Sequence, residues 1–94
     1  MFIITKDKIC NGEFNNYMEI NTSKTGTERT ALIAKITPRC IYKFRLLDDD
    51  GEVYCYGLSN DHGSEKAFNP LDWAMAEFGC TEIQYLENGI WETL

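Results

Sequence analysis

Long apolar runs are absent from this sequence of 94 residues. The longest, such as Ala31 to Ala34, fall far short of the roughly 20 residues that a membrane-spanning helix needs. The first residues, Met1 to Cys10, lack the longer apolar region and the small-residue cleavage site of a secretory signal. We therefore expect a cytoplasmic protein that has no membrane partner and that begins with a strand.

Paired cysteines of the zinc-binding type are also missing, because no two cysteines are separated by only two residues. The chain contains Cys10, Cys40, Cys55, Cys80 and a single histidine, His62. Four cysteines allow two disulfides in three pairings, but thiols stay reduced in a protein that is not exported. Cys40 and Cys55 could be neighbours on one hairpin, either as ligands or as small buried side chains. We predict free thiols and no bound metal.

Catalytic machinery is not recognisable in the sequence. Nucleophilic catalysis needs a hydroxyl or thiol beside a base, and His62 lies in a polar loop, Ser59 to Ser64, where a histidine is unremarkable. Carboxylates are so numerous that two of them can be close by chance, and the seven glycines are too scattered for a phosphate-binding loop. We predict that the chain is not an enzyme and that it has no catalytic residue and no cofactor.

Basic residues are scarce in the second half of the chain. Residues 1–47 contain eight Lys or Arg and four Asp or Glu, a net charge of +4, whereas residues 48–94 contain one Lys and eleven Asp or Glu, a net charge of −10. The overall net charge of −6 disfavours direct binding to nucleic acid, which depends on clustered cations. Such acidity can serve solubility alone. It can also form a surface that enters a basic groove made for DNA or RNA, and the segregation of charge favours this interpretation.

Large apolar side chains, by contrast, are plentiful. The composition is 44% hydrophobic and 13% aromatic, which is too rich for a disordered chain. A length of 94 residues suits one domain with one shared core. We predict a single domain over residues 1–94.

A first hairpin is predicted over residues 41–58. Ile41 to Leu47 and Glu52 to Leu58 are rich in aromatic and aliphatic residues, and Asp48 to Gly51 separates them. Aspartates followed by glycine suit a turn, because Asp bonds to nearby backbone and Gly supplies a positive φ. The run lacks the alternating ligands and the distant Glu of a calcium loop, so we interpret it as a turn with solvated carboxylates.

Alternation within the first arm of this hairpin predicts two different faces. Tyr42, Phe44 and Leu46 should share an apolar face, and Lys43 and Arg45 should lie on an opposite, wet face. The sheet is therefore expected to have one face in the core and one face in water.

A second hairpin is predicted over residues 81–94. Asn88-Gly89 is the preferred pair for a two-residue type I′ turn, and it lies between two arms that contain aliphatic and aromatic residues. That turn fixes the register and places Leu86 opposite Trp91.

A short helix is predicted over residues 70–78, packed on the sheet. Asn69 and Pro70 suit its cap and its first position, and Gly79 suits its end. Apolar residues spaced by three and four form one stripe, which consists of Leu71, Ala74, Met75 and Phe78.

The segment 27–36 permits two interpretations. Thr25 or Thr27 can cap a helix there, but the alternation from Ile33 to Thr37 also suits a strand. We favour a second helix, preceded by an exposed loop over Asn21 to Thr27. Together the patterns predict an α+β fold, whose mainly antiparallel sheet is built from the two hairpins with the short helix packed on it.

Four segments within residues 40–94 carry a resemblance. They are Phe44-Arg-Leu-Leu-Asp-Asp-Asp-Gly-Glu-Val-Tyr, Asn69-Pro-Leu-Asp, Gly79-Cys-Thr-Glu-Ile-Gln-Tyr and Gly89-Ile-Trp-Glu-Thr-Leu. As a set they resemble small uncharacterised proteins from bacterial phages, prophages and plasmids. The resemblance implies no catalytic residue or cofactor. It implies a setting in which small acidic proteins bind and block a host defence or regulatory protein, as anti-CRISPR and anti-restriction proteins do, several by imitating nucleic acid.

These observations favour a small acidic inhibitor or modulator that binds a basic, nucleic-acid-handling bacterial protein, such as a CRISPR-Cas component. Carboxylates of the first turn and the second hairpin should make the contact, with aromatic anchors beside them. The candidate partner-binding residues are Asp48, Asp49, Asp50, Glu52, Glu87, Glu92, Tyr54, Tyr56 and Trp91. Packing in the core is the competing interpretation for each aromatic residue. The alternative function is a small ligand- or metal-binding module, or a self-associating structural protein that adds strands at a sheet edge.

Overall fold

A computed structural model describes residues 1–8, 12, 18–19 and 26–94 of the chain. It confirms the α+β prediction, including a strand at the start. In chain order the elements are β1 (Phe2–Asp7), β2 (Met18–Glu19), α1 (Gly26–Ile36), η1 (Thr37–Arg39), β3 (Tyr42–Leu47), β4 (Val53–Ser59), η2 (Glu65–Phe68), α2 (Asn69–Phe78), β5 (Glu82–Glu87) and β6 (Ile90–Thr93).

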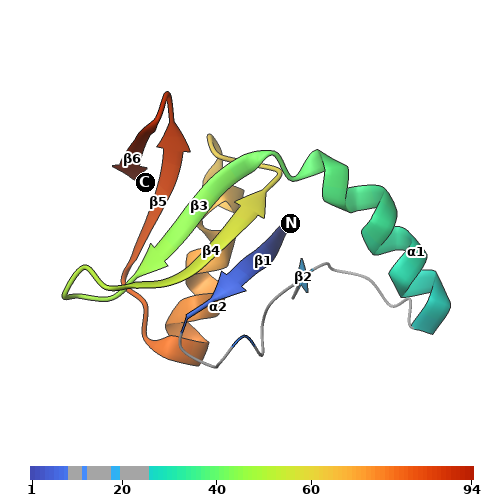
Figure 1. The fold of residues 1–94 in the computed structure, drawn as a ribbon, viewed down its shortest axis with the longest axis horizontal. Coiled ribbons are helices and arrows are strands. Elements are labelled where there is room, and N and C mark those ends of the chain that lie inside the picture. The colour runs from blue at the N-terminus through green and yellow to red at the C-terminus, as the bar shows by residue number, and fades with distance from the viewer. Residues whose placement is uncertain (9–11, 13–17, 20–25) are drawn as a thin grey trace.

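The strands form one antiparallel sheet in the order β2-β1-β4-β3-β5-β6 (Figure 1). Both predicted hairpins are present, and they are joined because β3 also pairs with β5, with Leu46 opposite Ile83. On the other side β1 pairs with β4, with Ile4 opposite Gly57. In this arrangement the β3–β4 turn lies beside the start of β5 and the β5–β6 turn lies at the other end of β5, while β6 lies at an edge of the described sheet (Figure 1).

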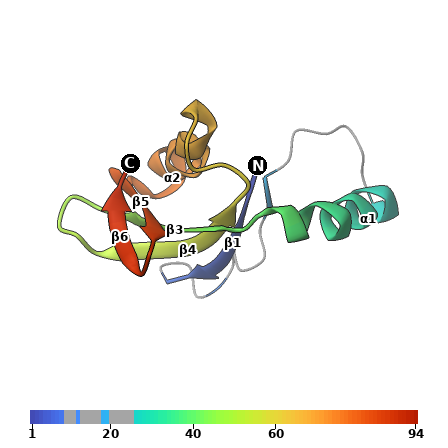
Figure 2. The same cartoon turned by 90° about the horizontal axis from the view of Figure 1, so that it is seen from above.

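The two helices take different positions relative to the sheet. Figure 2 shows α2 lying on one face of the sheet, while α1 extends away beyond the end of the sheet. We call the face opposite α2 the open face, and alternation along the strands places on it Lys43, Arg45, Tyr56, Leu58 and Trp91. Among the described residues, neither helix has the length and apolar character to cross a membrane.

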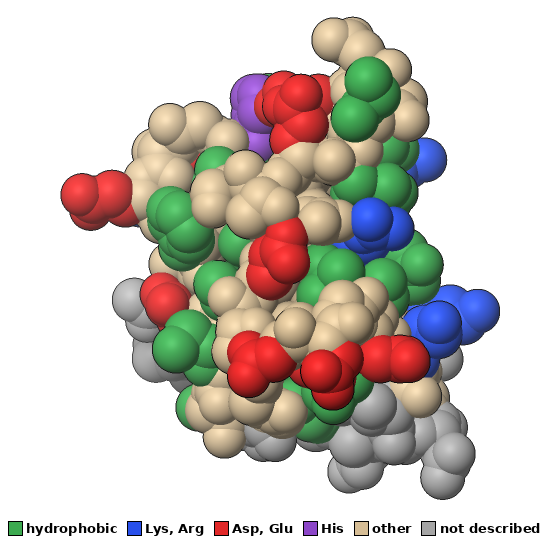
Figure 3. All heavy atoms as spheres, turned by 90° about the vertical axis from the view of Figure 1, so that its left-hand side faces the viewer, with side chains coloured by type: hydrophobic (Ala, Val, Ile, Leu, Met, Phe, Trp, Pro, Cys, Tyr) green, Lys and Arg blue, Asp and Glu red, His purple; other side chains and the backbone are tan. Residues whose placement is uncertain are grey.

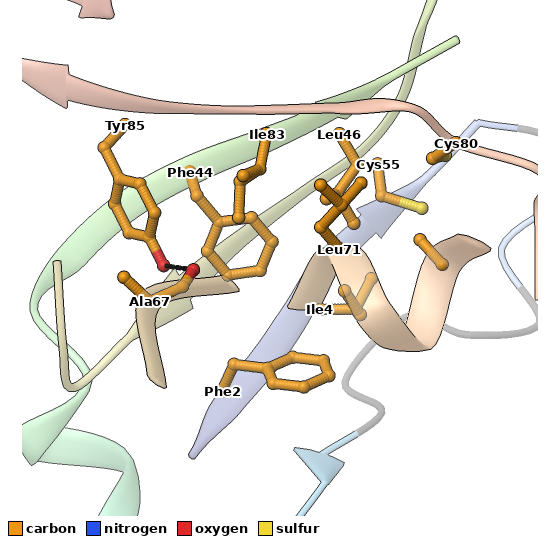
Figure 4. Packing of buried hydrophobic residues seen from close by; sticks show 11 residues of the cluster. Phe2, Ile4, Phe44, Leu46, Cys55, Ala67, Leu71, Cys80, Ile83 and Tyr85 are labelled. Carbon is orange, nitrogen blue, oxygen red and sulfur yellow. Dashed lines mark hydrogen bonds between the residues drawn. The ribbon is translucent and has the colours of Figure 1, made fainter. Parts of the chain in front are cut away.

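The core lies between the sheet and α2 (Figure 4). Its largest members include Phe2, Ile4, Phe44, Leu46 and Ile83, all essentially without solvent exposure. The phenolic oxygen of Tyr85 is buried there too, and it donates a hydrogen bond of 2.8 Å to the backbone oxygen of Ala67. That bond satisfies the one polar atom of an otherwise apolar side chain and links β5 to η2.

The side chain of Asp48 stabilises the turn of the first hairpin. The side-chain oxygen Oδ1 of Asp48 accepts hydrogen bonds of 2.9 Å from the backbone N–H groups of Asp50 and Glu52. Gly51 supplies the positive φ that the turn needs, at 81°. The turn prediction is confirmed, but the carboxylate of Asp48 is engaged with the backbone instead of being solvated.

The turn of the second hairpin is confirmed as type I′. Asn88 and Gly89 both have positive φ, at 52° and 78°. The register follows the prediction, since Leu86 lies opposite Trp91 and Glu87 lies opposite Ile90.

The helix α2 is confirmed with two corrections. Asn69 is the first residue of the helix and not its cap, because the preceding η2 already leads the chain into helical geometry at Phe68. Met75 is 55% exposed, so it does not belong to the buried stripe, which Leu71 and Ala74 form. Gly79 ends the helix as predicted, in the left-handed conformation with φ of 72°.

The helix α1 confirms the helical interpretation of the ambiguous segment. It begins at Gly26, so the loop predicted over Asn21 to Thr27 is wrong for its last two residues, and its first five lie outside the described residues. No residue of α1 is fully buried. Ile33 and Ile36 pack against a small second cluster that contains Ile3 and Cys40.

Candidate functional site

The predicted carboxylates of the first turn have two different roles. Asp48 holds the turn, and its pKa lies below the usual range because the backbone N–H of Glu52 donates to it, with a further bond from the Tyr54 hydroxyl. Asp49, Asp50 and Glu52 are exposed. Three of the four carboxylates are therefore available for a partner, and the fourth is structural.

The carboxylates of the second hairpin are also divided. Glu87 is exposed and lies 3.6 Å from Nε2 of His62, whose ring stacks on Tyr42 with 3.9 Å between the centroids. Glu92 is exposed on β6. Glu82, which the sequence did not single out, accepts hydrogen bonds from Thr93 and Gln84, and these lower its pKa.

The exposed carboxylates of the two hairpins lie at the end of the molecule opposite α1, and they are spread from the β3–β4 turn at the start of β5 to the β5–β6 turn at the end of β5. Figure 3 shows the side that lies at the left of Figure 1, where the β3–β4 turn and the β5–β6 hairpin are found. Acidic side chains are spread over this side, and the visible Lys and Arg side chains gather along one border. We define the acidic end as the exposed carboxylates Asp49, Asp50, Glu52, Glu87 and Glu92.

The three predicted aromatic anchors do not lie together. Tyr54 packs against the core cluster, which makes it a poor candidate for an anchor. Tyr56 and Trp91 lie on the open face, with 6.2 Å between their ring centroids. The guanidinium carbon of Arg45 lies 4.5 Å from the centroid of the Trp91 ring, so the wet face predicted for Arg45 is partly covered.

An apolar feature beside the acidic end was not predicted. Ile90 is 62% exposed and Leu94 is 40% exposed, and both lie close in sequence to Glu92 on the edge strand β6. The signal in the sequence was the apolar composition of the last segment, residues 90–94. A sheet with a helix on only one face leaves some of these side chains exposed.

The thiols are separated in the structure. Cys40, Cys55 and Cys80 are buried thiols, and Cys10 lies outside the described residues. Cys40 belongs to the cluster at α1 and Cys55 to the main core, so the idea that they are neighbours is wrong. Burial raises the pKa of Cys80 to about 11 and raises that of Cys40. Across the described ranges, no three His, Cys, Asp or Glu side chains come together as ligands for a metal ion.

Comparisons of this chain with protein-family models, with curated proteins and with solved structures found no significant match.

Proposed function

We propose that this chain is a small protein-binding inhibitor or modulator, and that its acidic end binds a basic surface on a nucleic-acid-handling bacterial protein. The observation that carries the proposal is that exposed carboxylates from two hairpins, distant in sequence, are spread over the same end of the molecule, opposite α1. A rigid sheet holds these charges at fixed separations, as a nucleic-acid backbone holds its phosphates.

Charged and apolar side chains have different roles in this proposal. Carboxylates at the acidic end steer the partner during encounter, because their field extends over about one Debye length, roughly 8 Å at physiological salt. Ile90 lies opposite Glu87 and supplies apolar area that is removed from water on contact. The partner is thus a protein with a basic groove beside a small apolar pocket.

The cellular setting follows from the resemblance of residues 40–94 to proteins of phages, prophages and plasmids. A protein of a mobile element that carries such a surface acts in the bacterial cytoplasm, where nucleic-acid-binding defence proteins such as CRISPR-Cas components are found. Blocking the groove of such a protein requires binding alone, without catalysis.

The experiment is affinity capture with two variants of equal charge. The test variant carries Asp49→Asn, Asp50→Asn and Glu92→Gln. The control variant removes three exposed carboxylates elsewhere, with Glu28→Gln, Glu65→Gln and Asp72→Asn. Asp48 is left unchanged in both because it holds the turn.

Each protein is immobilised and exposed to a nuclease-treated bacterial lysate, and the bound proteins are eluted with excess DNA. The proposal predicts a captured protein that DNA releases, that the control variant retains and that the test variant loses. Equal retention by both variants, or no release by DNA, would contradict it.

Self-association is a second candidate, because β6 is an edge strand with exposed Ile90 and Glu92. Exposed edges pair with further strands unless charge or a covering segment prevents it. Sedimentation over a wide range of concentrations would show a dimer if β6 pairs with its own copy. Replacing Ile90 with Lys should then restore the monomer.

A further inference from the structure

The open face contains a groove that the proposed function does not use. Its volume is about 230 Å³, and it crosses β1, β4, β3 and the tip of β6. The residues that line it are Thr5, Lys43, Phe44, Tyr56, Gly57, Leu58 and Trp91. The acidic end and this groove are built from different side chains, so each can be tested without the other.

The floor of the groove includes Phe44 and Gly57, which lie opposite each other on β3 and β4 with their side-chain positions directed into the core. A Cβ atom at Gly57 would lie 2.3 Å from Cζ of Phe44 and 2.5 Å from the backbone oxygen of Ile3. Any larger residue would therefore displace the Phe44 ring or the strand β1. Gly57 thus keeps β4 closely packed on the core, and the side chains of Tyr56 and Leu58 line the groove on either side of it.

The aromatic wall of the groove is held in position by neighbouring polar groups. Trp91 comes from β6 and Tyr56 from β4, and the two rings are tilted by 56°. The Arg45 guanidinium stacks over the indole of Trp91, and its Nε donates a 2.6 Å hydrogen bond to Oε1 of Gln84. This contact orders the indole before a ligand arrives, which lowers the entropic cost of binding.

Two cations lie at or near the rim of the groove. Lys43 lines the groove and is exposed, and Lys6 lies opposite Tyr56 in the register of β1 and β4. The carboxylate of Glu82, which interacts with Arg45, accepts hydrogen bonds from Thr93 and Gln84. In a protein of net charge −6, cations beside these half-buried aromatic rings form a local site for an anion.

We propose that this groove binds a small planar aromatic molecule that carries one negatively charged group. The ring lies over Gly57 against Tyr56 and Trp91, where it gains stacking and apolar contact. The charged group points to the rim and pairs with Lys43. An aromatic carboxylate and a nucleoside monophosphate share this chemistry, and the experiment separates them.

The probe is naphthalene-2-carboxylate, titrated into the isotopically labelled full chain, with naphthalene-2-carboxamide as the uncharged counterpart and adenosine monophosphate as the nucleotide. The chain has two tryptophans, so Trp91→Phe assigns the two indole N–H signals in the NMR spectrum. The site predicts a saturable shift of the Trp91 signal with the carboxylate, little shift of the Trp73 signal, and weaker binding of the carboxamide. If adenosine monophosphate binds more tightly than naphthalene-2-carboxylate, the groove prefers a nucleoside monophosphate to an aromatic carboxylate.

Three variants assign the binding to the groove. Lys43→Gln should weaken binding of the carboxylate by about two- to fivefold, the range of an exposed ion pair. Trp91→Ala should weaken it by at least about fivefold, as expected from the loss of one stacking partner. Lys66→Gln, an exposed change on η2, should have no effect.

Three results would overturn the proposal: shifts that never saturate, equal binding of carboxylate and carboxamide, or equal weakening by Lys43→Gln and Lys66→Gln. Lys43 is exposed, and an unchanged circular dichroism spectrum of the Lys43→Gln variant would show that a loss of binding does not come from unfolding.

Discussion

Replacing Gly57 with Ala should destabilise the protein by about 3 kcal/mol, at the upper end of the range for overpacking a core. The added Cβ would lie 2.3 Å from Cζ of Phe44 and 2.5 Å from the backbone oxygen of Ile3. Phe44 has no exposed surface, so its ring can move only by displacing other core residues. Ile3 belongs to β1, so its oxygen can move only if β1 shifts away from β4.

The matched control is Gly63→Ala, because a Cβ at Gly63 would have no heavy atom within 4 Å. Urea unfolding followed by circular dichroism measures both variants. With a denaturant dependence of roughly 1–3 kcal/mol per molar, the Gly57 variant should lose about 1 to 3 M in midpoint. The control should stay within about 0.5 kcal/mol of the parent, or gain slightly. Equal midpoints for the two variants would refute the packing argument.

A double variant identifies the atom that resists the new side chain. If the Phe44 ring dominates, Phe44→Leu combined with Gly57→Ala should cost less than the sum of the two single changes. If the Ile3 backbone dominates, the two costs should add.

Three further predictions concern the turns and the thiols. Gly89→Val should lower the free energy of unfolding by about 1–3 kcal/mol, because a β-branched residue opposes the positive φ of the type I′ turn, and an unchanged midpoint would exclude that turn. Asp48→Asn should flatten the acid side of the stability profile. Because the pKa of Asp48 is lowered in the folded state, its contribution to folding stability is present above the unfolded pKa of about 4 and is lost as pH falls through the folded pKa. A stability profile that the variant leaves unchanged from pH 7 to pH 2 would contradict this role. Thiol counting after denaturation without reductant should find four free thiols. In the native protein at pH 8, Cys40, Cys55 and Cys80 should react slowly with a thiol reagent because they are buried. Fast reaction of all four cysteines would contradict the burial of these three in the core.

Both hairpins could be predicted from the sequence because their turns are determined locally. Asn88-Gly89 provides the two positive φ angles of a type I′ turn, and this fixes which residues face each other across β5 and β6. Gly79 similarly fixed the end of α2 through its own conformation. Features of this kind depend on one or two residues and on no distant contact.

The positions of the aromatic residues could not be predicted in the same way. Strict alternation places Tyr54 and Tyr56 on one face, but the pairing of β3 with β4 shifts between Leu46 and Leu47, so that Tyr54 is an extra residue in β4. Tyr54 consequently packs against the core, while Tyr56 lies on the open face. The position of a bulge depends on the packing of neighbouring strands, and no short sequence pattern in β4 predicts this one.

The acidic surface was predictable in its charge and not in its shape. The sequence identifies the carboxylates of both hairpins, but the pairing of β3 with β5 decides that the hairpins lie side by side, with their turns at opposite ends of β5. The groove on the open face also depends on this order of strands, because Trp91 comes from β6 and Thr5 from β1, two strands far apart in the sheet order. Such long-range pairing is decided by the whole core.

The most direct test of the acidic end is the association rate with the captured partner, measured as a function of salt concentration. For the parent protein and the control variant with Glu28→Gln, Glu65→Gln and Asp72→Asn, the rate should fall by about tenfold or more as salt rises from low to high concentration. For the test variant with Asp49→Asn, Asp50→Asn and Glu92→Gln, the rate at low salt should already be close to the high-salt rate of the parent. A test variant that associates as fast as the parent at low salt, with the same salt dependence, would contradict the claim that the acidic end binds the partner.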